Sequence, residues 1–384
     1  MTATNVYLVT GASGVIGAAV VPLLLSEPDT EVRVLLRATS DTALSARLSE
    51  LMQFWAPRIG VTDGAGRLQA VRGDVGQTRL GLDARGHDAL AASVTNIIHA
   101  AGEVRLNQSL ERARTLAIGS ATEVVAFARR CASARGMAKL EYLSTVGVAG
   151  RRAGTIPEEP LANASGYHNT YEQAKAEAEA IVLREIERGL PATIHRPSMV
   201  VGDSRDGVVR RFQVFYHLLR FIAGSRTRGW LPAFGDARLD LVPADYVARA
   251  LVACSRRDDA VGRILHLCAG PTGAIRLADL GERLRVFLAS RGETVFRPRY
   301  LPLPAMRALL AVATPLSPGS VRRALATLPF FLDYLRDPQL FEHERTSRFL
   351  EGGGIVAPPI VRFLEPVLDY WYTRSSRHAD AAEA

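Results

Sequence analysis

The chain has 384 residues, of which 48% are hydrophobic, and a formal net charge of +8. This length is enough to bury a full hydrophobic core, and it fits one nucleotide-binding domain with a smaller second part. The basic residues are spread along the chain, without zinc-ligand spacing or a helix-turn-helix pattern, which argues against nucleic-acid binding. No apolar run reaches the roughly 18 residues of a membrane span, so only peripheral membrane contact stays open.

The cysteines and the first predicted strand indicate the cellular compartment. Cys131, Cys254 and Cys268 are odd in number and lie in apolar surroundings, so we expect buried free thiols in a reducing cytoplasm. The first predicted strand begins at residue 5, which leaves no space for a signal peptide. The oligomeric state, monomer or homodimer, is not indicated.

The first element is a short apolar strand at 5–10, which runs into a glycine-rich turn and a helix at 18–26. Strand, glycine-rich turn and helix N-terminus together form a pyrophosphate site, because backbone N–H groups and the helix dipole face the phosphates. The first glycine would permit the tight turn, the second the close approach of phosphate, and the third the packing of helix on strand. The residues expected to bind the cofactor here are Gly11, Ser13, Gly14, Val15, Ile16 and Gly17.

Strands and helices alternate over the next part of the chain. Predicted helices cover 41–56, about 109–135, and a segment that contains Lys175 and continues to 188. The strands between them are almost continuously apolar, as in parallel sheets that are covered on both faces. We therefore predict an α/β fold with a Rossmann-like, doubly wound parallel sheet, whose further strands lie at 31–37, 67–73, 95–100, 139–145 and 191–196.

Residues at the ends of these strands are expected to contact a dinucleotide. Arg37 follows the second strand, where an arginine suits the 2′-phosphate of NADPH and an acidic residue would suit the ribose of NADH. Asp74, with Val75 beside it, would suit the adenine amino group. After the fourth strand, His99 is expected to be a packing residue, and the residues that would pass beneath the cofactor are Ala100, Ala101 and Gly102.

Lys175 stands four residues after Tyr171, and the chain contains only one other lysine, Lys139. Residues four apart lie on one face of a helix. A lysine ammonium beside a phenol lowers the pKa of the phenol. We therefore expect a tyrosine that gives or takes a proton near neutral pH. By itself the Y-x-x-x-K spacing also occurs by chance on solvent-facing helices.

As a set, these motifs resemble the extended short-chain dehydrogenase/reductases, and within them the thioester-reductase and fatty-acyl-CoA-reductase (male sterility) branch. The resemblance covers roughly residues 5–270. The motifs that carry the extended family are the glycines at 11–17, Gly73-Asp74-Val75, His99-Ala-Ala-Gly102, Leu143-Ser144-Thr145, Tyr171-x-x-x-Lys175 and His195-Arg196-Pro197. Those that suggest the branch are Leu35-Leu36-Arg37-Ala38, Ala46-Arg47-Leu48, Gly81-Leu82 and the segment from Arg196 to Gly207.

The resemblance implies the catalytic residues Thr145, Tyr171 and Lys175, with Ser144 as the register alternative to Thr145. The threonine and tyrosine would bind the substrate carbonyl oxygen, the tyrosine as general acid, while the lysine holds the nicotinamide ribose of NADPH. No metal is implied. The residues that would line the nicotinamide side are Pro197, Ser198 and Val200.

Two positions depart from the family pattern. Many relatives carry an asparagine on the helix after the fourth strand, but this chain has none near Ala117, where it reads Thr115-Leu-Ala-Ile118-Gly119. Ala174 stands before Lys175, where relatives often have a small hydroxyl residue. The first departure puts any relay or spacing role of that amide in doubt.

The distal part is rich in large apolar residues, which could form a tunnel for an acyl chain or simply pack a core. We expect residues 1–270 to form the NADP-binding domain, with a substrate-subdomain insertion at about 203–238. Residues 271–384 would form a mainly helical substrate-binding subdomain that ends in a frayed tail after Tyr372. Five arginines could contact the phosphates of coenzyme A or an acidic carrier protein, or they could only face solvent. They are Arg210, Arg211, Arg220, Arg226 and Arg228.

The sequence therefore predicts an NADPH-dependent reductase of acyl thioesters, carried on coenzyme A or an acyl carrier protein. The product would be an aldehyde or, after a second hydride, an alcohol. A ketoreductase or hydroxysteroid-type dehydrogenase with the same three catalytic residues stays open, and a sugar epimerase is disfavoured by the apolar distal half. A non-catalytic NADP-binding sensor is the alternative outside the enzymes, although it would not need the threonine–tyrosine–lysine set.

Overall fold

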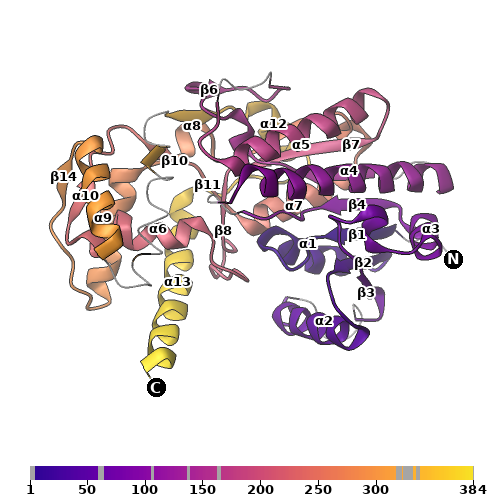
Figure 1. Ribbon diagram of the computed structural model, residues 1–384, viewed down its shortest axis with the longest axis horizontal. Coiled ribbons are helices and arrows are strands. Elements are labelled where there is room, and N and C mark those ends of the chain that lie inside the picture. Colours follow the sequence, from indigo (N-terminus) through magenta and orange to yellow (C-terminus); the bar gives the residue numbers. More distant parts are fainter. Residues whose placement is uncertain are drawn as a thin grey trace.

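The computed structural model describes residues 5–58, 65–104, 108–135, 139–161, 166–316, 322, 332–333 and 338–383. Figure 1 shows two parts: a sheet with its covering helices on the right, and a smaller, mainly helical part on the left. Within the described residues, no helix is both long enough and apolar enough to cross a bilayer. The three cysteines are buried and free, as predicted.

The larger part is built on a parallel sheet of seven strands in the order β12-β7-β5-β4-β1-β2-β3. All of its neighbouring strands pair in parallel, which confirms the predicted fold class. The order reverses between β1 and β4, and ligands of such sheets bind beyond the carboxyl ends of the strands at this point. The strands are β1 (Asn5–Thr10), β2 (Thr30–Leu36), β3 (Leu68–Arg72), β4 (Asn96–His99), β5 (Lys139–Leu143), β7 (Ala192–Pro197) and β12 (Ile264–Leu267).

Helices cover both faces of this sheet. Figure 1 shows α4 (Leu110–Arg135) and α5 (Thr170–Glu187) above the strands and α1 (Val15–Leu25) below them. Contacts join α4 to α5 and to α3 (Ala84–Ser93) on one face, and α1 to α7 (Ala244–Ser255) on the other. The indole nitrogen of Trp55, the last residue of α2 (Asp41–Trp55), donates to Ala18 O at 2.9 Å and so fastens α2 to α1.

The strands are apolar at nearly every position because both faces of the sheet are buried. In β1, Val6 and Leu8 belong to the cluster that includes Phe127 of α4. Tyr7 and Val9 belong to the other cluster, with Val20 of α1. Successive side chains of a strand point to opposite faces, so a strand between two helical layers is apolar at every position.

The smaller part joins two stretches of the chain. Helix α6 (Val214–Ile222) packs on α9 (Leu277–Ser290). Strand β9 (Trp230–Pro232) pairs with β14 (Arg299–Leu301), and β10 (Arg238–Leu239) with β13 (Ile275–Arg276). Helix α10 (Leu303–Leu316) contacts β9. Strand β8 (Met199–Val201) and its parallel partner β11 (Leu241–Pro243) lie where the chain leaves and re-enters the sheet region.

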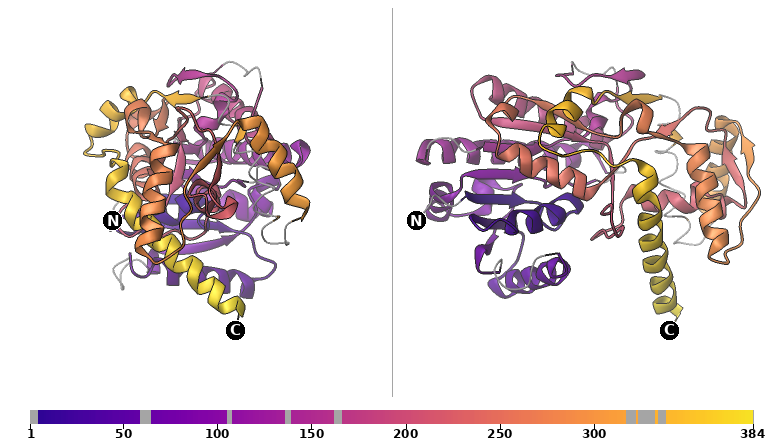
Figure 2. Two further views of the ribbon diagram at one scale, coloured as in Figure 1. Left: turned by 90° about the vertical axis from the view of Figure 1, so that its left-hand side faces the viewer. Right: turned by 180° about the vertical axis from the view of Figure 1, so that it is seen from behind.

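The C-terminal segment does not stay within the smaller part. Strand β15 (Gln339–Phe341) pairs with β6 (Gly154–Ile156), and α12 (Glu344–Glu351) packs on β12. Helix α8 (Gly270–Gly273) contacts β15. The tail that the sequence predicts to be frayed continues as helix α13 (Ile360–Glu383), which begins between the two parts and projects away from them in Figure 2.

Candidate active site

The glycine-rich turn after β1 has the geometry of a phosphate cradle. Gly11 has a φ of +75°, and a Cβ added to it would lie 2.5 Å from the carbonyl carbon of Ala100 and the nitrogen of Ala101. A Cβ at Gly17 would lie 2.3 Å from Gly11 O. The Gly14 N–H donates to Gly11 O at 2.8 Å. The backbones of β1, α1 and the segment after β4 therefore meet where side chains cannot fit.

This turn leads directly into α1, which begins at Val15, three residues earlier than predicted. Its N-cap, Gly14, offers no side chain to the first backbone N–H groups of the helix. Backbone N–H groups of this kind donate hydrogen bonds to a bound phosphate. The pyrophosphate of a dinucleotide would therefore fit beside Ser13, Val15 and Ile16.

The predicted adenosine-binding residues lie at the same edge of the sheet. Arg37 is exposed after β2, and the Arg47 guanidinium donates to its carbonyl oxygen at 3.0 Å. Asp74 follows β3, accepts from Gly76 N at 3.0 Å, and donates its own N–H to Leu80 O at 2.8 Å.

The two smaller predicted residues of this region differ in how they are packed. Val75 packs against the hydrophobic core, so its side chain supports the loop after β3. Gly102 is exposed, and nothing lies within 4 Å of a Cβ placed there. The structure therefore gives no steric reason for a glycine at residue 102.

Two of the predicted catalytic side chains lie close to each other. Thr145 directly follows the loop after β5, and its Oγ1 accepts from Gly147 N at 3.1 Å. Tyr171 lies in the first turn of α5, close enough to Thr145 for the threonine hydroxyl to lower the pKa of its phenol. Ser144, the register alternative, has a buried Oγ without a partner among the described residues. The geometry therefore selects Thr145 over Ser144 as the partner of the tyrosine.

Lys175 is one helical turn further along α5, with its side chain 7% exposed. Its Nζ donates to Leu143 O at 2.7 Å and lies 4.9 Å from the centroid of the Tyr142 ring. The Tyr142 ring is stacked on His99 with centroids 5.4 Å apart, and His99 Nδ1 is 2.9 Å from Thr10 Oγ1. Residues from the ends of β1, β4 and β5 thus support the lysine from below.

Burial changes the acid–base properties of these groups, and it overturns one expectation. Burial and the neighbouring Glu172 raise the pKa of Tyr171 to about 12, against the influence of the Thr145 hydroxyl, which lowers it. Burial lowers the pKa of Lys175 to about 8, with Glu179 acting against it, and the pKa of His99 to about 3. The predicted lowering of the tyrosine pKa by the lysine is wrong for this state, because desolvation of the phenolate dominates. The low pKa of His99 fits its predicted role in packing.

A buried ion pair fixes α5 to the sheet. Arg196 is fully buried on β7, and its guanidinium binds the Glu179 carboxylate through contacts of 2.6 and 3.1 Å. The same guanidinium donates to Glu159 O at 2.9 Å. Glu179 lies one turn beyond Lys175, so the pair holds the helix that carries both predicted catalytic residues.

The predicted nicotinamide side is braced by an aspartate that sequence reasoning missed. Pro197 ends β7, and the Ser198 hydroxyl donates to Asp240 Oδ1 at 2.6 Å. Asp240 also accepts from Gly270 N at 3.0 Å, and its burial raises its pKa. Val200 lies in β8, opposite Val242 of β11.

Several other predictions concern single positions. Ala117 and Ile118 pack against the core in the region where relatives carry an asparagine. The Arg220 side chain is 29% exposed and pairs with Glu293 at 2.8 Å. Arg210 reaches the glycine-rich turn instead of a substrate surface. No sequence motif marks Arg210 or Tyr142, since each acts on a residue far away in the chain.

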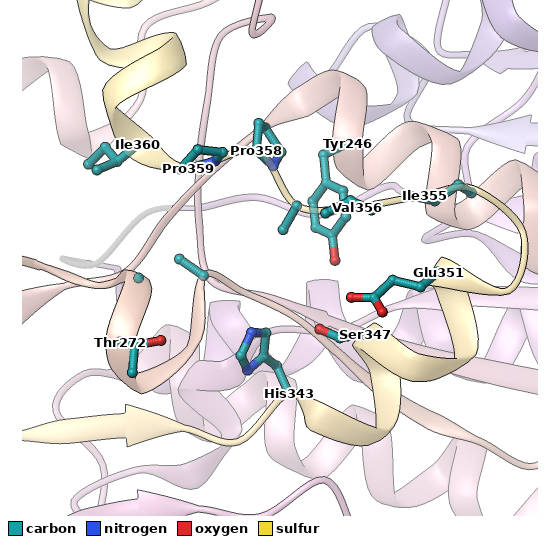
Figure 3. Close-up of a pocket in the computed structure, with 13 residues that line it drawn as sticks. Tyr246, Thr272, His343, Ser347, Glu351, Ile355, Val356, Pro358, Pro359 and Ile360 are labelled. Atoms are coloured by element: carbon teal, nitrogen blue, oxygen red, sulfur yellow. The ribbon is translucent and has the colours of Figure 1, made fainter.

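A cavity of about 340 Å³ lies elsewhere, between α7, α8, α12 and the segment before α13. Figure 3 shows the hydroxyls of Tyr246 and Ser347 and the carboxylate of Glu351 around this space, with His343 beside them. None of the predicted catalytic residues lines it. Among the described residues, no group of histidine, cysteine and carboxylate side chains is placed to hold a metal ion.

Comparisons with known proteins show which proteins the chain and its fold are similar to. The chain is 29% identical over 396 aligned residues to the isonitrile lipopeptide synthase of Streptomyces coeruleorubidus, which covers 98% of this chain but only 25% of that protein. The terminal R domain from the myxalamid PKS-NRPS biosynthetic pathway superposes with a TM-score of 0.79 at 28% identity, over 97% of this chain and 92% of that one. A thiolation-reductase di-domain from an archaeal non-ribosomal peptide synthetase has the same fold, with a TM-score of 0.76 at 17% identity over 97% of this chain and 76% of that one.

The chain thus spans about a quarter of the length of its first curated relative. Residues 9–251 match the family model described as "Male sterility protein", which is more than half of the chain and includes the glycine-rich turn, Thr145, Tyr171 and Lys175. The chain therefore belongs to the male sterility family of NAD(P)-binding reductases, within the extended short-chain dehydrogenase/reductases.

Proposed function

We propose that the chain uses NADPH to reduce an acyl thioester, presented on a carrier protein, to an aldehyde. The observation that carries this proposal is that Thr145 and Tyr171 lie close together, one helical turn before Lys175, at the strand ends that also hold the glycine cradle. The similarity to a terminal R domain of a PKS-NRPS pathway over nearly the whole chain supports a thioester as the substrate class. The likeness to a thiolation-reductase di-domain favours a carrier over coenzyme A.

The cradle fits a dinucleotide, because Gly11 and Gly17 let the backbone segments pack closely beside the uncapped N-terminus of α1, where phosphates bind. NADPH is favoured over NADH by Arg37, which follows β2, and by Arg47, whose guanidinium reaches the Arg37 carbonyl oxygen. The cofactor would supply a hydride to the carbonyl carbon of the thioester.

The protein's own groups would act on the carbonyl oxygen. Negative charge builds on this oxygen during hydride transfer, and donors already directed at it stabilise the transition state. Tyr171 is suited to be the proton donor, since a pKa of about 12 keeps it protonated at physiological pH. Thr145 accepts a backbone hydrogen bond at its Oγ1 and so keeps its own hydroxyl proton available for donation. The resulting hemithioacetal would collapse to an aldehyde and a free thiol.

The test is NADPH oxidation by the purified protein with acyl-carrier and acyl-coenzyme A thioesters, ketones and aldehydes, with free thiol counted in parallel. We expect one thiol for each NADPH oxidised, with carrier-bound thioesters as the better substrates. Two NADPH per thiol would indicate that reduction continues to the alcohol. Oxidation with ketones but without thiol release would instead establish a ketoreductase. Tight NADPH binding without turnover of any carbonyl would indicate a sensor.

A further inference from the structure

Arg210 enters the cofactor region from a distant part of the chain. Its Nη1 donates to the carbonyl oxygen of Ser13, in the glycine-rich turn, at 2.8 Å. Its Nη2 binds Glu50 of α2 at 2.7 Å. The Arg210 side chain is only 7% exposed, whereas that of Glu50 is 67% exposed. A guanidinium is thus held, nearly buried, between the phosphate turn and α2.

Other cations crowd this position. Burial lowers the pKa of Arg210, and the charges of Arg211 and Arg47 lower it further, against the attraction of Glu50. Arg47 also donates to the carbonyl oxygen of Arg37, at the end of β2. Arginines from two separate segments, Arg47 of α2 and the pair Arg210 and Arg211, therefore come together beside the turn. Like charges brought together in this way disfavour one another unless an anion is bound among them.

The segment that carries Arg210 is anchored on both sides. We call residues 203–210 the strap. Asp206 of the strap binds Arg58, just after α2, at 2.9 Å. On the other side, a Cβ at Gly207 would lie 2.1 Å from the carbonyl oxygen of Pro366 in α13. The Tyr370 hydroxyl of α13 donates to Val209 O at 3.1 Å. The strap thus lies between the cofactor turn and the C-terminal helix.

We propose that Arg210 is a cofactor-specificity residue that binds the 2′-phosphate of NADPH and thereby fixes the strap against the glycine-rich turn. This inference rests on the NADPH preference within the proposed function. A phosphate monoester carries two negative charges near neutral pH and accepts paired hydrogen bonds from a guanidinium, whereas the ribose hydroxyl of NADH does neither. The dianion would relieve the repulsion among Arg210, Arg211 and Arg47, which the single exposed carboxylate of Glu50 balances only in part.

The consequence is a link between cofactor identity and the substrate side of the protein. Through Arg210 the 2′-phosphate would hold the strap, and through Gly207 and Val209 the strap touches α13. Binding of NADPH should therefore fix the contact between the strap and α13, and binding of NADH should leave this contact unchanged.

The experiment measures binding of NADPH, NADH, 2′,5′-ADP and 5′-AMP by calorimetry, without turnover. In Arg210→Met we expect the affinity for NADPH and 2′,5′-ADP to fall by about 10- to 100-fold, the range for a hydrogen-bonded charge, while that for NADH and 5′-AMP changes less than about twofold. The matched control is Arg205→Met, on the same strap, whose side chain is 73% exposed and paired with Asp203. We expect this control to bind all four ligands as the wild type does.

A second variant separates phosphate binding from a merely structural tether. Glu50→Gln removes the carboxylate that now holds Arg210, so we expect NADPH affinity to stay or rise. The proposal would be overturned if Arg210→Met lowered the affinities for NADPH and NADH equally, or if Glu50→Gln lowered both affinities. Arg210 would then be only a structural contact. Thiol release with NADPH but no affinity for 2′,5′-ADP would overturn it while the proposed reduction stands. If Arg210→Met does not fold, Arg210→Lys replaces it, because the lysine keeps the charge but loses the paired geometry.

Discussion

Lys175 lies where its charge costs stability, so replacing it by methionine should stabilise the protein at neutral pH while abolishing turnover. Lys175 is 7% exposed, and burial lowers the pKa of its ammonium from 10.5 to about 8. The charge of Glu179 offsets only part of this lowering of the lysine pKa. Methionine has a similar length and no charge, so it can occupy the same space without desolvating an ion.

The magnitude follows from the two pKa values. The fall from 10.5 to about 8, at about 1.4 kcal/mol for each pH unit, corresponds to ~3 kcal/mol of unfavourable free energy for the charged lysine. At pH 7 this cost is fully present, since the pH lies below both values. The lost hydrogen bond to Leu143 O and the contact with the Tyr142 ring together subtract about 1–2 kcal/mol. We expect Lys175→Met to be more stable than the wild type by about 1–2 kcal/mol.

The pH dependence checks the cause. A group whose pKa is lower in the folded state contributes its full stability above the unfolded pKa and loses it as the pH falls through the folded pKa. The wild type should therefore gain about 2 kcal/mol relative to the variant between pH 7 and pH 9.5, measured by urea unfolding. The control is Lys139→Met: Lys139 pairs with the fully buried Glu141 at 3.3 Å, so this variant should lose stability. A Lys175→Met variant that is less stable at pH 7, or a difference that does not change with pH, would refute the reasoning.

Three further outcomes are expected. Tyr171→Phe should lower thiol release by at least about 100-fold while the NADPH dissociation constant stays within about twofold, because only the proton donor is lost; unchanged turnover would contradict its role. Gly17→Ala should lose NADPH binding in a fluorescence titration, because its Cβ would lie 2.3 Å from a backbone oxygen of the turn; normal affinity would show that the turn can relax. Glu179→Gln should lower the free energy of unfolding by about 3–5 kcal/mol, as it leaves Arg196 buried without its partner, and a change below about 1 kcal/mol would contradict this reading.

The sheet could be predicted from the sequence because each strand lies between two helical layers. Strand β1 was expected at 5–10 and runs from Asn5 to Thr10. Its residues are apolar at nearly every position, and the glycine-rich turn marks its end. The cradle could be predicted for a related reason, since Gly11 and Gly17 stand where backbone segments meet within 2.5 Å of a missing Cβ.

The environment of the catalytic groups could not be predicted in the same way. Spacing placed Tyr171 and Lys175 on one face of α5, but their pKa values depend on burial by residues from other strands. The lysine is held by Leu143 O and the ring of Tyr142, more than 30 residues earlier in the chain. Arg210 reaches Ser13 across 197 positions, a contact that no local pattern records.

Burial thus changes which of the two residues titrates near neutral pH. In solution a phenol and an amine have similar pKa values, of about 10. In the site, the charged form of each is disfavoured, so the pKa of Tyr171 rises to about 12 and that of Lys175 falls to about 8. The lysine, and not the tyrosine, is therefore the group that titrates close to physiological pH. Tyr171 therefore keeps its proton at physiological pH, as the proposed proton donor must.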